Sequence, residues 1–146
     1  MYNITKKLLP LQTKKQSKAH LLETNNSKKN NMKPLNKQFA PKSVMPEKVI
    51  QFGEGNFLRA FVDWIIWNMD QKTDFNGSVV VVQPIERGMV DWLNAQDCLY
   101  HVNLQGRENG KPVNTLERID VISRALNPYS QNAAFMALAD QPEIRF

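Results

Sequence analysis

Residues 49–60 read Val-Ile-Gln-Phe-Gly-Glu-Gly-Asn-Phe-Leu-Arg-Ala, and this stretch decides which fold the sequence predicts. Three of its first four residues are β-branched or aromatic, which is typical of a short strand. Gly53 and Gly55 follow at once, and closely spaced glycines predict a tight turn. The stretch therefore indicates a strand over 49–52 that gives way to a glycine turn.

The residues after the turn predict a buried helix. Apolar side chains recur there at the spacing of one helical stripe, which is the pattern of a helix packed against a core. The stripe consists of Leu58, Val62, Ile65 and Met69, with Phe57, Phe61 and Trp64 alongside, and Arg59, Asp63 and Asp70 share the other side. Asn56 is a favoured residue type for the helix N-cap. Asn76-Gly77 marks the turn that follows the helix.

A second strand is expected over 79–82, where four valines follow one another. An uninterrupted apolar run is what a parallel strand covered on both faces requires. Pro84 ends the run. Strand, turn, helix and second strand occupy about 35 residues, which is the size of one right-handed βαβ unit.

Further along, the pattern predicts a hairpin. Residues 99–104 alternate enough for a strand, Asn109-Gly110 is a strong turn signal, and residues 113–123 are expected to form the returning strand. We expect this hairpin to be inserted in the α/β sheet. Residues 89–96, just before it, fit either a short helix or a loop.

The last segment predicts a helix over 127–139 and then the first residues of another strand, Ile144-Arg145-Phe146. A domain boundary rarely falls inside a strand, so we expect the domain to continue beyond this chain. The predicted fold class is therefore α/β. It is an incomplete Rossmann-type dinucleotide-binding domain over residues 32–146, with a β-hairpin insertion and a disordered basic tail in front.

The glycine turn is the candidate dinucleotide site. Where a strand passes through glycines into a helix, free N–H groups and the positive helix end converge on a diphosphate. Gly53 permits the tight turn, and Gly55 lets the backbone approach the phosphates without a Cβ in the way. The third glycine of the usual G-x-G-x-x-G pattern would fall at Leu58 and is missing, so the motif alone is weak. The cofactor-binding residues predicted here are Phe52, Gly53, Glu54, Gly55, Asn56 and Phe57.

An acid near the end of the second strand is expected to hydrogen-bond the ribose hydroxyls of NAD. Glu86 is the nearby acid and lies slightly past the strand, and Gln83 is an alternative polar partner. Simple exposure accounts for Glu86 equally well. Arg87 keeps NADP open as the cofactor, because an arginine in this region can hold a 2′-phosphate.

Charge divides the chain into two parts. Residues 1–48 carry eleven lysines and two acids, whereas residues 49–146 carry eight Arg or Lys and twelve acids. The polar, lysine-rich part predicts a disordered basic extension over 1–31, and Met32 is a candidate for the true start. No DNA-reading module accompanies these lysines, so no nucleic-acid partner is expected.

Other kinds of function find little support. No apolar run approaches membrane-spanning length, so no membrane partner is expected. The single Cys98 excludes an internal disulfide and favours a reducing, cytoplasmic location. We interpret Cys98 as a buried neutral thiol and His101 as a structural or exposed side chain without a catalytic partner. Arg59 fits either an anion contact near the turn or an i,i+4 pair with Asp63.

The run from Ile50 to Trp64 resembles the start of enzymes of the mannitol dehydrogenase family, which comprises long-chain polyol and hexuronate dehydrogenases. The core G-x-G-x-F-x-R-A is shared across that family, and the flanks Gln51-Phe52 and Val62-Asp63-Trp64 favour its hexuronate reductases. Leu58 is no departure from the pattern, because this family tolerates a bulky residue there. The resemblance covers about residues 32–146.

This resemblance implies an NAD-dependent oxidoreductase with an amino-terminal Rossmann-type domain, a helical carboxy-terminal domain and no metal. It implies hydride transfer between NAD(H) and a hexuronate ketone, reducing tagaturonate to altronate or the reverse. The family's catalytic Lys and its Asn and His partners are expected downstream of Phe146, so no residue here is matched to them, and the chain alone is expected to be inactive. A sister enzyme for fructuronate or a mannitol-type polyol, or a noncatalytic nucleotide-binding remnant, is the alternative.

Overall fold

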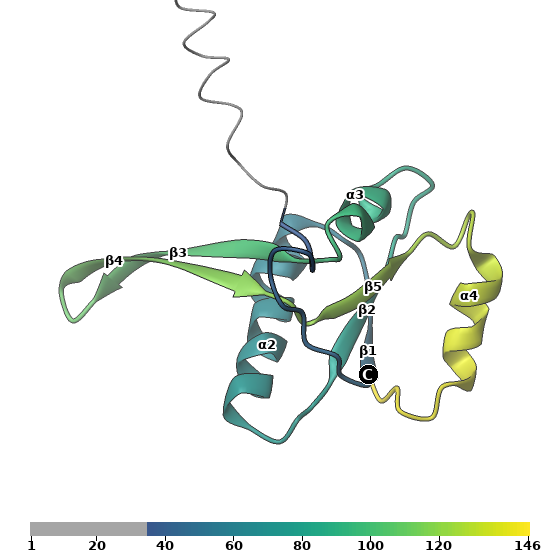
Figure 1. Cartoon of the computed structure of the whole chain (residues 1–146), viewed down its shortest axis with the longest axis horizontal. Coiled ribbons are helices and arrows are strands. Elements are labelled where there is room, and N and C mark those ends of the chain that lie inside the picture. The colour runs from purple at the N-terminus through teal and green to yellow at the C-terminus, as the bar shows by residue number, and fades with distance from the viewer. Residues whose placement is uncertain (1–34) are drawn as a thin grey trace, which may run out of the picture. The chain divides into compact units, whose positions relative to one another are not determined.

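The computed structural model describes residues 35–146. The predictions of a disordered extension over 1–31 and of a start at Met32 lie outside the described residues. In the described part, three parallel strands form a sheet in the order β1-β2-β5 (Figure 1). These strands are β1 (Glu47–Phe52), β2 (Ser78–Val82) and β5 (Ile122–Leu126). The predicted α/β, Rossmann-type fold is confirmed.

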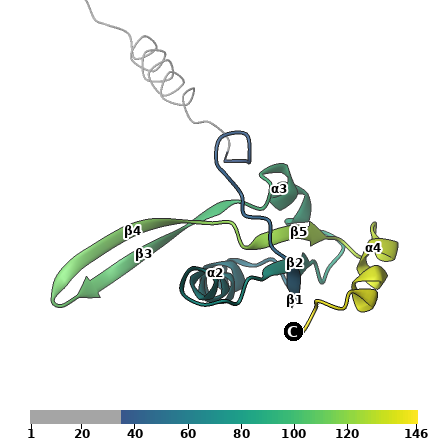
Figure 2. The same ribbon diagram turned by 60° about the horizontal axis from the view of Figure 1, so that its bottom comes forward.

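The valine run forms the central strand, β2, and every one of its residues is buried. Side chains alternate between the faces of a strand, so the valines are divided between two cores. Val79 and Val81 pack into the larger core, on the side of the long helix. Val80 and Val82 pack with Leu138 on the opposite face (Figure 2). An apolar residue at each position is therefore required, because neither face of this strand meets water.

One long helix follows the glycine turn and covers the larger core. It contains a π-helical segment, Leu58–Val62, that runs directly into α2 (Asp63–Lys72). The Asp63 N–H donates to the Leu58 carbonyl, five residues back, as a π-helical turn requires.

The predicted buried side of this helix is wrong by one residue. Arg59, Asp63 and Ile66 are buried, whereas Ile65 and Met69 are 40% and 37% exposed. The prediction counted only hydrophobicity, but the core beneath the helix offers hydrogen-bond acceptors and donors to Arg59 and Asp63. Polar side chains that find hydrogen-bond partners can be buried, so Arg59 and Asp63 point inward beside Ile66, whereas Ile65 and Met69 lie at the surface.

The predicted hairpin is present but forms its own two-stranded sheet. It consists of β3 (Tyr100–Glu108) and β4 (Lys111–Ile119), and it extends away from the parallel sheet as an arm (Figures 1 and 2). Asn109 and Gly110 both have positive φ, which fits the tight turn that their sequence predicts. The single strand predicted over 113–123 is wrong, because the chain leaves the hairpin after Ile119 and enters the parallel sheet as β5.

The remaining helices are short. α3 (Val90–Ala95) occupies the region predicted as helix or loop. The helix predicted over 127–139 is reduced to α4 (Asn132–Met136) and a 3-10 turn, Ala137–Asp140.

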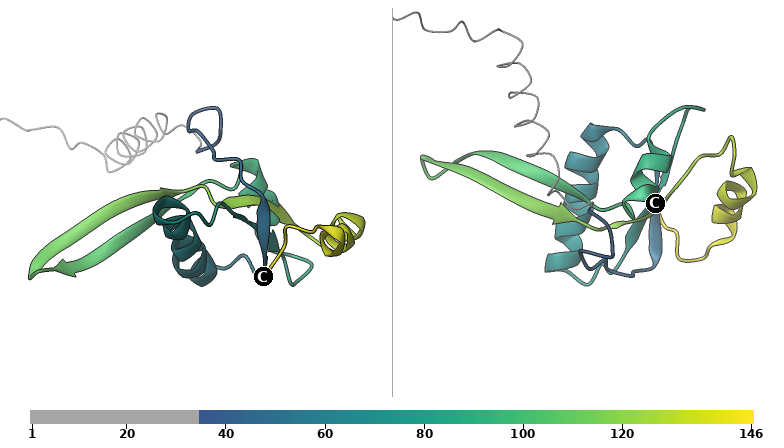
Figure 3. Two further views of the ribbon diagram at one scale, coloured as in Figure 1. Left: turned by 90° about the horizontal axis from the view of Figure 1, so that it is seen from below. Right: turned by 45° about the horizontal axis from the view of Figure 1, so that its top comes forward.

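The last residues reach the free edge of β1 (Figure 3). The Phe146 N–H donates to the Lys48 carbonyl at 3.2 Å, and the Ile50 N–H donates to the Phe146 carbonyl at 2.9 Å. This pair of bonds is the pattern of a parallel ladder. The residues predicted to begin a strand at Ile144 therefore pair with β1 at Phe146, although residues 144–146 do not form a regular strand.

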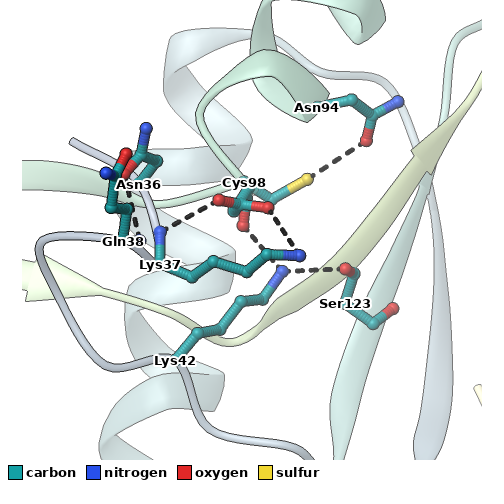
Figure 4. A network of polar contacts seen from close by, with 8 residues as sticks. Asn36, Lys37, Gln38, Lys42, Asn94, Cys98 and Ser123 are labelled. Carbon is teal, nitrogen blue, oxygen red and sulfur yellow. Dashed lines mark hydrogen bonds and ion pairs between the residues drawn. The ribbon is translucent and has the colours of Figure 1, made fainter. Parts of the chain in front are cut away.

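The segment before β1 is held by hydrogen bonds at the end of the sheet where β1 and β5 begin, which is the end opposite the glycine turn (Figure 4). The Lys42 ammonium donates to the carbonyls of Asp97 and Ser123, at 2.7 and 2.8 Å, and Lys37 pairs with the Asp97 carboxylate. Cys98 lies in the same network and donates to Asn94. These contacts fix the start of β1 and thereby the position of the turn at its other end.

Candidate dinucleotide site

Gly53 ends β1 in a conformation that favours glycine. Its φ is +121°, and its N–H still donates to the Val82 carbonyl at 2.8 Å. A Cβ added at this position would lie 2.9 Å from Leu58 Cδ1. Gly53 is therefore needed to turn the chain sharply from strand to helix.

Gly55 has a different role, because the protein itself does not require a glycine there. Its φ is not positive, and a Cβ added to it would meet no atom within 4 Å. Within residues 35–146 the Gly55 N–H donates no hydrogen bond. The first N–H groups of the helix that follows also have no intrahelical partner. The turn thus presents open space and unpaired donors together, which fits a diphosphate.

The carbonyl groups of the turn are held away from this space. The Gln51 side-chain amide donates to the Gly53 carbonyl at 3.1 Å, and Arg59 Nε donates to the Glu54 carbonyl at 3.0 Å. Because both carbonyls are bound on the protein side, the turn offers donors rather than acceptors to a ligand.

Arg59 lies on the protein side of the turn and holds it in shape by hydrogen bonds. It is 7% exposed, Nη2 donates to Asn56 Oδ1 at 2.6 Å, and the guanidinium lies against the rings of Trp92 and Tyr100. It makes no ion pair with Asp63 or with any other acid in the described part of the chain. Of the two interpretations of Arg59, the i,i+4 ion pair is therefore wrong.

Asn56 does not act as the predicted N-cap. It lies inside the first helical turn, and its side-chain oxygen accepts from Arg59 instead of from a backbone N–H. The two phenylalanines predicted at the site are exposed. Phe52 packs edge-on against Phe135, and Phe57 stacks on Phe61.

Glu54 connects the turn to the loop after β2. Glu54 is 8% exposed, and its carboxylate accepts from the Met89 N–H at 3.3 Å. A Cβ added to Gly88 would lie 2.2 Å from that carboxylate, so the loop approaches Glu54 as closely as only glycine allows. Glu54 therefore fixes the position of this loop relative to the glycine turn.

The structure separates the two candidates for the ribose contact. Gln83 is 2% exposed, and its amide is fully engaged with the carbonyls of Ile85 and Glu86 and with the Val90 N–H. Glu86 is exposed, and its carboxylate has no partner among residues 35–146. Gln83 fixes the conformation of the loop after β2, whereas the carboxylate of Glu86 is accessible to a ligand.

Burial raises the pKa of two groups beneath the turn and of one group near the start of β1. Burial raises the pKa of Asp63 to about 7, although hydrogen bonds from Gln51 and Tyr100 and the Arg59 charge oppose the shift. Burial and the nearby Asp63 raise the pKa of Tyr100. Burial also raises the pKa of the Cys98 thiol to about 11, in line with the interpretation of a neutral thiol. His101 is exposed.

Sequence reasoning missed Gln51, Asp63 and Tyr100 as parts of the site. The signals available were a polar residue inside a predicted strand and an acid flanked on both sides by large apolar residues of the predicted helix. Within residues 35–146, no helix is long and apolar enough to cross a membrane. The same residues gather no group of three His, Cys, Asp or Glu side chains suited to a metal ion.

A parallel sheet in the order β1-β2-β5, with a glycine turn between β1 and a covering helix, defines a Rossmann-type dinucleotide-binding domain. The mannitol dehydrogenase Rossmann domain family matches residues 47–146. The chain belongs to this family.

Curated relatives share this part of the chain. An altronate oxidoreductase of Phocaeicola vulgatus is 76% identical over 115 residues, and one of Bacteroides thetaiotaomicron is 75% identical over 115 residues. One from Escherichia coli is 46% identical over 116 residues. Each match covers 79% of this chain and 24% of the relative, so the chain spans about a quarter of the length of these proteins.

Solved structures agree on the fold. Mannitol 2-dehydrogenase of Pseudomonas fluorescens, in a ternary complex with NAD and D-mannitol, superposes with a TM-score of 0.60 at 23% identity. That match covers 76% of this chain and 25% of the other. A substrate-free D-sorbitol dehydrogenase gives a TM-score of 0.58 at 22% identity, covering 72% and 22%.

Proposed function

We propose that this chain is the NAD-binding part of an altronate oxidoreductase, also called tagaturonate reductase, which interconverts D-tagaturonate and D-altronate with NAD(H). The observation that carries the proposal is the 76% identity to the Phocaeicola vulgatus altronate oxidoreductase over 115 residues. An NAD-dependent sugar-acid oxidoreductase is the broader class, supported by the family match to residues 47–146. We place the protein in the cytoplasm.

In this proposal the turn holds the diphosphate of NAD. The Gly55 N–H and the first helical N–H groups bind the phosphate oxygens in the open space beside Gly55. The exposed Glu86 carboxylate accepts from the ribose hydroxyls, as Rossmann-type sites that bind NAD do. When bound, NAD(H) supplies the hydride that converts the ketone of a hexuronate to an alcohol, or takes it up in reverse.

The catalytic groups belong to the rest of the enzyme. Among the described residues near the turn, no side chain is placed to donate a proton to a substrate carbonyl. Asp63 and Tyr100 are buried, and the exposed side chain of His101 has no hydrogen-bond partner in residues 35–146 that would orient it. We therefore expect the 146-residue chain to bind NADH without oxidising it.

NADH binding tests the site directly. Gly55→Val fills the open space, so we expect NADH fluorescence titration of the purified chain to show affinity lowered at least about tenfold. Gly106→Val is the matched control, because a Cβ there also meets no atom within 4 Å but lies on the hairpin. Equal affinity in the two variants would contradict the proposed site.

Substrate choice is tested with the length that the relatives have beyond the matched region. A chimera joins this chain to the part of the Phocaeicola vulgatus relative that follows the matched region. We expect it to oxidise NADH with tagaturonate, because this chain then takes the place of the relative's own NAD-binding part. No turnover of tagaturonate by this chimera, together with turnover when the chain is joined instead to the corresponding part of a fructuronate reductase or a mannitol dehydrogenase-type enzyme, would assign the chain to one of those enzymes. NADH binding without turnover of any of these substrates would favour a noncatalytic nucleotide-binding remnant.

A further inference from the structure

A cluster of buried polar side chains lies directly beneath the glycine turn. Asp63 is fully buried, and Gln51 and Tyr100 are each 6% exposed. In residues 35–146, Asp63 Oδ1 and Gln51 Oε1 are both buried without a hydrogen-bond partner. Leaving a buried acceptor unpaired is costly, so two such acceptors in neighbouring side chains call for an explanation.

Asp63 shares two donors with the backbone: the Gln51 amide, which has two N–H groups, and the Tyr100 hydroxyl, which has a single proton for which the two acceptors compete. The Gln51 amide lies 3.1 Å from the Gly53 carbonyl and 3.4 Å from Asp63 Oδ2. The Tyr100 hydroxyl lies 2.8 Å from the Arg59 carbonyl and 3.4 Å from the same Asp63 oxygen. Both donors are closer to the backbone than to the carboxyl group, and these backbone bonds shape the turn and the π-helical segment.

The charge of Asp63 decides whether this balance persists. An ionised carboxylate attracts a donor about twice as strongly as a neutral acceptor. Ionised Asp63 would therefore draw the single Tyr100 hydroxyl proton from the Arg59 carbonyl. It would also pull the Gln51 amide, whose two N–H groups can serve both acceptors, closer to itself. A neutral carboxylic acid leaves both donors on the backbone and gains a proton to donate.

The same charge acts on the ligand through space. Arg59, on the same helix, carries a buried positive charge with no ion pair in the described residues. While Asp63 is neutral, the Arg59 charge beneath the turn attracts an anion without opposition. Ionisation of Asp63 cancels that attraction at short range.

We propose that Asp63 is a positioning residue for the dinucleotide turn and that its neutral form favours binding of a diphosphate. The proposal rests on the proposed function of the turn. Burial raises the pKa of Asp63 to about 7, so both forms are populated near neutral pH. Arg59 and Tyr100 are the other charged or titratable groups that face Asp63, and the exposed His101 borders a cavity of about 190 Å³ together with Arg59.

The test is the pH dependence of ADP-ribose binding to the purified 146-residue chain. ADP-ribose carries the diphosphate without the nicotinamide, and the charge of that diphosphate is constant between pH 6 and pH 8.5. We expect the parent chain to bind about tenfold more weakly at pH 8.5 than at pH 6 by calorimetry. Asp63→Asn mimics the neutral acid and is expected to bind equally well at both pH values.

Three further variants make the result specific. Asp63→Ala, which removes the side-chain acceptor, is expected to weaken binding at both pH values. Asp140→Asn removes an exposed carboxylate on the other face of the sheet and is expected to keep the parent profile. His101→Gln is also expected to keep it, because this histidine is not part of the buried cluster.

Two outcomes would overturn the proposal in different ways. If Asp63→Asn retains the parent pH dependence, or if His101→Gln abolishes it, the role of Asp63 is refuted while the turn remains a binding site. If the parent chain binds no ADP-ribose at either pH, the proposed function of the turn fails and the role of Asp63 fails with it.

Discussion

Asp63 and Arg59 point into the core from a helix whose exposed side carries large apolar residues. Each is retained there by particular partners. Arg59 bonds to the Glu54 carbonyl and Asn56, and Asp63 lies between Gln51 and Tyr100. At the scale of single residues, the site therefore depends on buried polar side chains as much as on the glycines of the turn.

The raised pKa of Asp63 makes the stability of the chain depend on pH. Its folded-state pKa of about 7 lies above the unfolded value of 3.8, so the folded protein binds this proton more tightly. Folding stability is therefore not reduced by Asp63 below the unfolded pKa. The reduction grows as the pH rises between the two pKa values and is complete above the folded one. We expect Asp63→Asn to be more stable than the parent at pH 8, with a difference that widens by about 3 kcal/mol from pH 5 to pH 8.

Urea unfolding of the two chains at several pH values measures this difference. The comparison is needed because other carboxylates titrate in the acid range and affect both chains alike. A difference that stays constant with pH would show that Asp63 is ionised throughout.

At the scale of elements, Asp120 joins three parts of the fold. It lies in the link from β4 to β5 and is 7% exposed. Its carboxylate accepts from the Ser43 N–H and hydroxyl, in the segment before β1, and from the Trp67 indole on α2. One side chain thus holds the entrance of the first strand, the long helix and the base of the hairpin together.

Removal of this junction is expected to destabilise the whole unit. Asp120→Ala removes the acceptor of three hydrogen bonds from the exposed Ser43 and the half-buried Trp67, which we expect to lower the free energy of unfolding by about 2 kcal/mol. Asp91→Ala, at an exposed position of α3, is the control and is expected to change it by less than about 0.5 kcal/mol. Equal effects of the two substitutions in urea unfolding would refute the junction.

The elements were predictable where the chain obeys one local pattern. The strand before Gly53, the valine strand and the turn at Asn109-Gly110 were all read correctly, because each has a short-range signal. β5 was not separated from the hairpin, since Arg118 to Ser123 reads as one continuous run and only tertiary pairing divides it. The buried side of the long helix was predicted wrongly for a related reason. Hydrophobicity contains no information about hydrogen-bond partners that other elements supply.

The candidate site was predictable to the same degree. Gly53 and Gly55 have backbone roles that sequence spacing reveals. The functions of Glu54 and Gln83 were not foreseen, because both depend on the loop around Gly88, which folds back onto them. Glu54 and its partner Met89 lie 35 positions apart, and proximity at that separation has no signal in a single sequence. The partners of Gln83 are near it in sequence, but the shape of the loop that brings them to its amide follows no simple turn pattern.

At the scale of the whole molecule, the long helix leaves an apolar stripe exposed. Phe57 and Phe61 are 73% and 53% exposed, and Ile65 and Met69 continue the same side. An exposed stripe of this kind favours association. We expect the 146-residue chain to self-associate at micromolar concentrations in light-scattering chromatography.

Charged residues on the stripe should reverse this behaviour. Phe61→Glu combined with Ile65→Lys is expected to yield a monomer with unchanged ADP-ribose affinity. The matched control is Leu116→Lys, an equally exposed apolar position on the hairpin, which is expected to leave association as it is. If the stripe variant still associates, contacts elsewhere, such as the free edge of β1, are responsible.

The valine strand carries one more consequence, which concerns how the sheet finds its alignment. A slip of β2 by one position would exchange Val79 and Val81 with Val80 and Val82 and present the same side chain to each core. Four identical residues therefore hold no information about their own register. That information resides at the ends of the strand, in the Ser78 hydroxyl, which donates to the Met45 carbonyl, and in the amide of Gln83. In this strand the valines stabilise the two cores, and the polar side chains at its two ends determine the register.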